Sequence, residues 1–85
     1  MDRVAWSMDH RGFLAVQSCE SGWEYTFYDE KFHELDGGQL DDPELSIQEA
    51  RNVLAADFGW SRCSMTLISY EDFIEKVEKT YLENA

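Results

Sequence analysis

Residues 23–28 read WEYTFY and show the clearest β-strand pattern in the chain. Trp23, Tyr25 and Phe27 alternate with Glu24 and Thr26, and this period of two is typical of a strand with one buried face. We therefore expect the three aromatic side chains to share a face that packs against the core.

The residues on the amino-terminal side of this strand predict two more strands. Val4, Trp6 and Met8 occupy alternate positions, as in a half-buried strand. Residues 13–16 are a continuous apolar run, which is typical of a strand covered on both faces. Turns are expected at residues 9–12 and 20–22, where glycine and polar residues gather.

Residues 32–35 predict a short fourth strand after a turn at residues 29–31. Phe32 and Leu35 cannot face the same side of a regular strand, so a bulge or an early exit from the strand is expected there. Residues 35–44 hold the glycine pair Gly37-Gly38 and Pro43, the chain's only proline, and this segment is expected to be the main loop.

The period becomes helical after residue 45. Ser46 and Glu49 have the spacing of a capping box, and an apolar stripe runs on to Phe58, where Gly59 can end the helix. Residues 63–68 alternate as another strand. Ser69 is placed to cap a second helix, whose stripe includes Phe73, Val77 and Tyr81.

This element order predicts an α+β fold in a single small acidic domain spanning residues 1–85. The simplest arrangement is a mainly antiparallel sheet of four to five strands with two helices packed on one face.

Charge excludes several classes of function. The chain has 18 Asp and Glu residues against 7 Lys and Arg, a net charge of -11. It lacks the cations needed to bind nucleic acid directly through phosphates or to sit on an anionic membrane. No secretion signal or membrane-spanning run is present, so we expect a cytoplasmic protein with reduced thiols at Cys19 and Cys63.

No motif indicates catalysis, a metal or a cofactor. His10, His33, Cys19 and Cys63 lack the paired spacing of zinc ligands, and the acidic segment after Asp36 fails the calcium-loop pattern. We expect a protein that is not an enzyme and holds no metal or cofactor. A small metal-dependent enzyme is the weakest of three hypotheses.

The acids are concentrated between residues 20 and 49. This segment holds ten Asp and Glu residues, and its only Lys or Arg residue is Lys31. Side chains on one face of a strand repeat every ~6.6 Å, close to the ~6.8 Å between alternate phosphates of one DNA strand. Such a hairpin can resemble a nucleic-acid backbone, or the acids can simply keep a small domain soluble. The candidate partner-binding residues are Glu24, Tyr28, Asp29, Glu30, Glu34, Asp36, Asp41, Asp42 and Glu44, with Tyr28 expected as an exposed anchor.

Three segments resemble a family of short acidic domains found in conjugative elements of Firmicutes, alone or inside large polyvalent proteins. They are the aromatic strand 23–29, the stretch 34–40 containing LDGGQL, and the capped helix start 46–51. The resemblance implies a mobile-element setting, where small acidic proteins include anti-CRISPR and antirestriction inhibitors. No catalytic residues are carried over.

Two hypotheses follow. The first is a non-enzymatic inhibitor that mimics nucleic acid and blocks the basic channel of a host defence protein, most plausibly an RNA-guided nuclease. The second is an interaction or regulatory module of a conjugative element, with the acids serving solubility. The sequence leaves the oligomeric state open.

Overall fold

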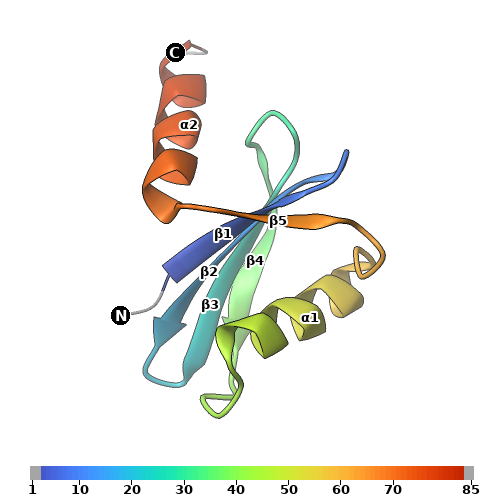
Figure 1. Cartoon of the computed structure of the whole chain (residues 1–85). Coiled ribbons are helices and arrows are strands. Elements are labelled where there is room, and N and C mark those ends of the chain that lie inside the picture. Colours follow the sequence, from blue (N-terminus) through green and yellow to red (C-terminus); the bar gives the residue numbers. More distant parts are fainter. Residues whose placement is uncertain (1–2, 84–85) are drawn as a thin grey trace.

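The computed structural model describes residues 3–83, which form a five-stranded antiparallel sheet and two helices (Figure 1). The α+β class is confirmed. The elements are β1 (Arg3–Met8), β2 (Gly12–Cys19), β3 (Gly22–Tyr28), β4 (Glu34–Leu40), α1 (Ile47–Phe58), β5 (Met65–Ile68) and α2 (Tyr70–Glu83).

The sheet is a four-stranded meander completed by one crossover. Strands β1 to β4 pair in chain order, and α1 then carries the chain to β5, which pairs with β1. The strand order is therefore β4-β3-β2-β1-β5, with β4 and β5 at the two edges.

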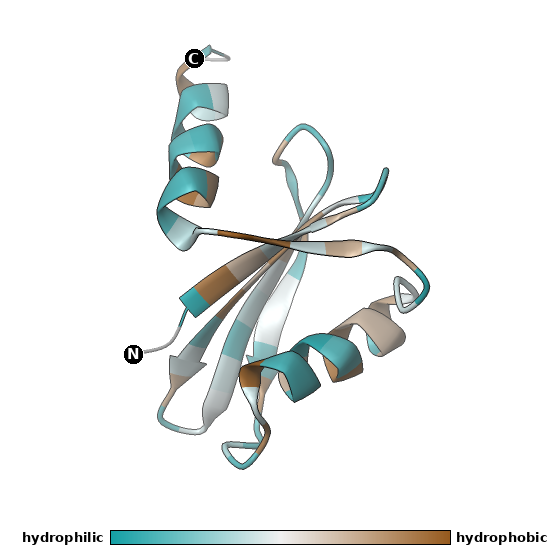
Figure 2. Cartoon of the chain, viewed as in Figure 1, coloured by the Kyte–Doolittle hydropathy of each residue, from teal (hydrophilic) through white to brown (hydrophobic). Residues whose placement is uncertain are grey.

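The larger core lies between α1 and one face of the sheet. Trp23 and Phe27 are buried there and Tyr25 is half-buried against them, which confirms the shared aromatic face of β3. Leu54 and Ala55 close this core from α1. Strong apolar colour lies on β1, β5 and the start of α1, whereas most of α2 is hydrophilic (Figure 2).

The second helix covers the opposite face, so the expectation that both helices pack on one face is wrong. Phe73 and Val77 of α2 form a separate buried cluster with Ala5 and Ala15. Successive residues of a strand point to opposite faces, and both alanines neighbour residues of the first core. Their small side chains leave room for the Phe73 ring, which is 0% exposed.

Both predicted helix starts are confirmed. The Glu49 backbone N–H donates to the Ser46 hydroxyl at 3.1 Å, and the Ser46 backbone N–H donates to the Glu49 carboxylate at 3.0 Å. Gly59 ends α1 with φ 86°. Ser69 is the residue before α2 begins, and its hydroxyl accepts a hydrogen bond from the Asp72 backbone N–H at 3.1 Å.

The glycine pair lies in a strand, so the prediction of a main loop over residues 35–44 is wrong for residues 35–40 and holds for residues 41–44. Strand β4 runs over Glu34–Leu40, and Gly38 pairs with Tyr25. A Cβ on Gly38 would lie 3.2 Å from the Tyr25 hydroxyl, so glycine lets this side chain lie close across the hairpin. The expected bulge is present, since the register shifts between Phe27 and Tyr28.

Two smaller boundaries also differ from the prediction. Phe32 precedes the fourth strand and has φ 64°, a turn conformation in which its ring stacks on Phe13 with centroids 4.5 Å apart. The fifth strand begins at Met65 and not at Cys63, because the Cys63 backbone N–H turns back to the Trp60 carbonyl.

Replacing the helix cap tests this part of the fold. Ser46→Ala removes one side of the capping box, and we expect a loss of about 1 kcal/mol in the free energy of unfolding, measured by urea denaturation. Ser61→Ala, at an exposed position outside both helices, is the control and should leave stability unchanged. Equal stability of both variants would mean that the box does not support α1.

Candidate functional site

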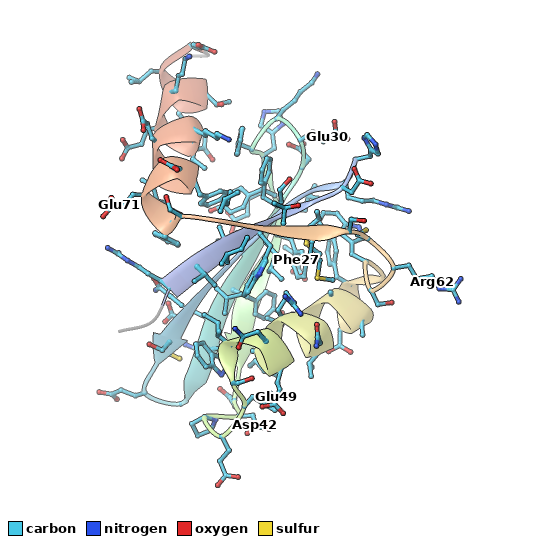
Figure 3. The ribbon with its side chains drawn as sticks, viewed as in Figure 1. Phe27, Glu30, Asp42, Glu49, Arg62 and Glu71 are labelled. Atoms are coloured by element: carbon cyan, nitrogen blue, oxygen red, sulfur yellow. The ribbon has the colours of Figure 1, made fainter. Side chains whose placement is uncertain are left out.

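The acids of the central segment lie along the β3–β4 hairpin and at its two ends. Glu30 lies at the turn between the strands, whereas Asp42 and Glu49 lie at the other end, where the chain enters α1 (Figure 3). The seven residues of β4 separate the two ends, a distance of about 20 Å for an extended strand.

The turn-end acids have different roles. Asp29 folds the turn: one of its carboxylate oxygens accepts the backbone N–H groups of Lys31 at 2.8 Å and His33 at 2.9 Å. These bonds, the His33 bond foremost, hold the pKa of the Asp29 carboxyl below its usual value. Its other oxygen lies 3.3 Å from the His33 ring. Glu30 is exposed and makes none of these contacts.

At the α1 end of the hairpin, two acids also accept hydrogen bonds from backbone N–H groups. The Asp42 carboxylate accepts the Glu44 N–H at 3.2 Å. Glu49 belongs to the capping box, and the Ser46 backbone N–H lowers the pKa of the Glu49 carboxyl. Asp41 and Glu44 are exposed and contribute no side-chain hydrogen bond to this turn.

The three acids within the strands do not form one same-face row. The register places Glu24 and Glu34 on the α2 side of the sheet, and Asp36, paired with Phe27, on the α1 side. Glu24 is half-buried and accepts a hydrogen bond from Gln17 at 2.8 Å. The same-face repeat expected for a phosphate-like row is therefore absent, because the exposed acids Glu34 and Asp36 point to opposite faces of the sheet.

Tyr28 is not the exposed anchor that was expected. It is half-buried and packs edge-on against Phe73, with ring centroids 5.2 Å apart. Burial and then the Glu34 carboxylate raise the pKa of its hydroxyl. Its role is chiefly to join the hairpin to α2.

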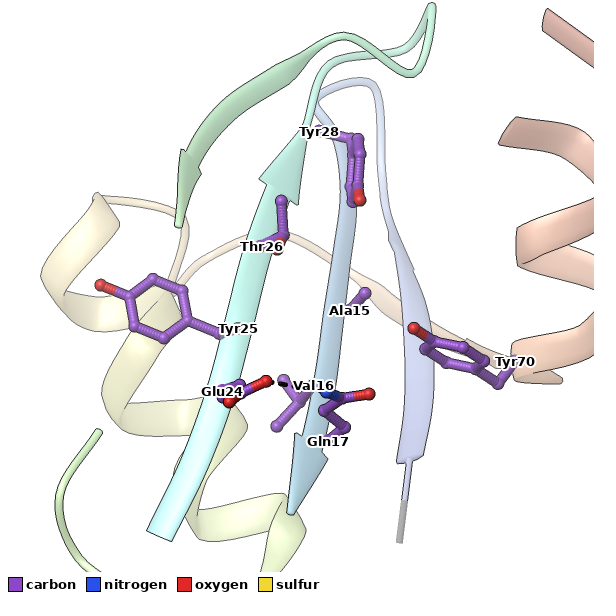
Figure 4. A pocket seen from close by; sticks show the side chains of 8 residues that line it. All are labelled: Ala15, Val16, Gln17, Glu24, Tyr25, Thr26, Tyr28 and Tyr70. Atoms are coloured by element: carbon purple, nitrogen blue, oxygen red, sulfur yellow. Dashed lines mark hydrogen bonds between the residues drawn. The ribbon is translucent and has the colours of Figure 1, made fainter. Parts of the chain in front are cut away.

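A shallow pocket of about 110 Å³ opens on the α2 side of β2 and β3 (Figure 4). Tyr70 lies at one side of it, and Gln17 and Glu24 lie together at its lower end, joined by their hydrogen bond. Pockets that enclose small molecules usually measure 300 Å³ or more. This one also holds no pair of a nucleophile and a base, so it is assigned no chemistry.

No group of three His, Cys, Asp or Glu side chains gathers within residues 3–83 in a way that would hold a metal ion. Cys19 and Cys63 are free and half-buried. Neither helix in this part of the chain is long and apolar enough to cross a membrane.

The negative charge of the hairpin is not neutralised from within. Across residues 3–83 the two ion pairs each join a histidine to an aspartate, His10 to Asp9 and His33 to Asp29. Lys and Arg side chains of these residues form no salt bridge with a carboxylate. Those of Arg3 and Arg51 instead lie over the rings of Tyr70 and Trp6.

Comparison with family models places this arrangement in a known group. Residues 1–80 match the model described as large polyvalent protein-associated domain 16. The chain belongs to this family. The mobile-element setting implied by the sequence resemblance is thus supported at the level of a domain associated with large polyvalent proteins. No curated protein and no solved structure matched the chain.

The role of Asp29 predicts a pH effect. Because its pKa is lowered by folding, its contribution is complete above the unfolded value of 3.8 and is lost as the pH falls through the lower folded value. Asp29→Ala should reduce the free energy of unfolding by about 1 kcal/mol at pH 7, and by less near pH 2, measured by urea denaturation.

The exposed neighbour provides the control for that measurement. Asp41→Ala should change stability little at either pH, since exposed carboxylates contribute little. A loss from Asp29→Ala that is the same at both pH values would show that the ionised carboxylate does not hold the turn.

Proposed function

We propose that this domain is a non-enzymatic interaction module that uses the exposed acids of the β3–β4 hairpin to bind a basic surface on a partner protein. One observation carries the proposal: within residues 3–83 these carboxylates have no Lys or Arg partner. An unneutralised acidic surface attracts a basic partner and speeds encounter.

The structure divides the candidate residues into two sets. Asp29, Asp42 and Glu24 are engaged in hydrogen bonds within the domain. The acids available to a partner are Glu30, Glu34, Asp36, Asp41 and Glu44, all of them exposed.

The partner that we favour is a host defence protein with a basic nucleic-acid channel, such as an RNA-guided nuclease. In that role the domain is an acidic nucleic-acid mimic of the anti-CRISPR type. The association of its family with large polyvalent proteins supports only the mobile-element setting of the domain. The choice of partner is drawn from the span between the two acidic ends, about 20 Å, which equals about six phosphates of one strand.

Charge reversal in two places tests the proposal. We expect Glu30→Lys/Glu34→Lys/Asp36→Lys to lose most binding at 0.15 M salt, mainly through slower association. The matched control is Glu71→Lys/Glu75→Lys/Glu78→Lys on α2, also exposed and with the same change in net charge. The measurement is recovery of nucleases on the tagged protein from a defence-competent bacterium, followed by association kinetics with the recovered protein.

Three outcomes separate the alternatives. Loss confined to the hairpin variant supports the proposal, and competition by guide RNA or target DNA supports channel blockade. Equal losses from both variants would mean that only net charge matters. Unchanged recovery with both variants would leave the acids with a solubility role in a polyvalent protein.

A further inference from the structure

The outer edge of β4 carries backbone groups that no strand within residues 3–83 pairs. We propose that this edge receives an extended, basic segment of a partner protein as a sixth strand of the sheet. β4 has one neighbour, β3, and its residues from Glu34 to Gln39 are all exposed. Strand addition of this kind supplies affinity through main-chain hydrogen bonds.

The register identifies the groups that point outward. Cys19 and Gly22 close a two-residue turn, and such a closing pair is hydrogen-bonded. Counting from this pair, hydrogen-bonded and non-bonded pairs alternate along the ladder between β2 and β3. The N–H and C=O groups of Tyr25 therefore point toward β4, and those of its partner Gly38 point back toward β3.

The backbone N–H and C=O groups of the residues on either side of Gly38 therefore point away from β3, toward the open edge. Gly37 and Gln39 present their N–H and C=O groups to an incoming strand. The Asp29 N–H donates to the His33 carbonyl at 2.9 Å, which agrees with this alternation at the far end of the hairpin.

The second half of this edge lacks the devices that usually block pairing. Proteins protect edges with very short strands, charged side chains, proline, bulges or a covering element. β4 carries its bulge and its charges, Glu34 and Asp36, at the start of the strand, whereas residues 37–40 have no charge, proline or bulge. The opposite edge strand, β5, has only four residues.

The charges along the edge select the occupant. Glu34 and Asp36 stand at one end, and Asp41 and Glu44 follow the other end. The stretch between them, residues 37–40, is uncharged. An extended segment with Lys or Arg near both ends and uncharged residues in the middle is complementary to this pattern.

A second copy of the domain is a poor occupant of the same edge. Antiparallel pairing that joins Gly37 of one β4 strand to Gln39 of the other would bring Glu34 of one copy beside Asp41 and Asp42 of the other. Like charges directly opposite are destabilising, and each copy carries -11. The acids thus oppose self-association while they favour a basic strand.

This inference rests on the proposed function, since the same acids select the partner, but it adds a requirement for backbone pairing. The probe is the synthetic peptide KVTVTVK added to ¹⁵N-labelled protein. We expect shift changes centred on the amides of Gly37 and Gln39, and hydrogen exchange at these amides slowed on the order of tenfold or more. EVTVTVE should not bind.

Backbone pairing is separated from charge in two ways. KVTVTVK N-methylated at alternate residues keeps its charge but loses strand donors, and its affinity should fall at least tenfold. In the protein, Gln39→Pro removes one outward N–H, a change that edge strands tolerate, and should weaken KVTVTVK binding. Gln39→Val keeps the N–H and should bind like the parent domain.

Equal binding of the methylated and unmethylated peptides would overturn strand addition while leaving acidic docking intact. So would shift changes centred on β5 or α2, or a concentration-dependent dimer built on β4. If KVTVTVK does not bind at all, strand addition fails, whereas the nuclease recovery experiment still decides the proposed function. The methylated peptide needs no protein variant, so misfolding of Gln39→Pro would not obscure the result.

Discussion

Phe27 stacks on Phe58 with ring centroids 4.1 Å apart, and Trp60 meets both rings edge-on. These contacts join the carboxyl end of β3 to the carboxyl end of α1, where the crossover turns back toward β5. Aromatic rings bury large areas and prefer these stacked and edge-on arrangements. The helix is thereby held across one face of the sheet, and the order of the strands depends on that position.

The bare edge of β4 is a consequence of the same crossover. Because α1 crosses one face of the sheet and delivers β5 beside β1, none of the five strands described remains to pair with the outer edge of β4. Gly37 and Gly38 leave the centre of this outer strand without side chains. The hairpin therefore presents backbone at its centre and carboxylates at its ends, an arrangement suited to an extended, positively charged segment.

The acids contribute to this domain in two ways. Asp29, Asp42 and Glu49 accept backbone N–H groups in the turns and at the start of α1, so they stabilise the hairpin and the crossover. Such bonds strengthen when the acceptor is charged. The remaining exposed acids lower the stability of the compact state slightly through mutual repulsion, and they supply the surface that a basic partner can use.

The local patterns in the sequence determined where most strands lie, where both helices start and that residues 20–49 are strongly acidic. These features depend on neighbouring residues: alternation at WEYTFY, serine caps at 46 and 69, and a glycine at 59. The apolar run 13–16 indicated a strand covered on both faces, but it did not identify the element that covers each face. The candidate acids were found from composition, but their division into turn-forming and exposed groups was not.

Only the tertiary structure decided the face taken by α2, the inclusion of Gly37-Gly38 in a strand, and the position of that strand at an open edge. The physical reason is that strand order and face depend on contacts between residues far apart in the chain. Gly37-Gly38 resembles a turn when read locally, and becomes a strand because β3 lies beside it and supplies its hydrogen-bond partners.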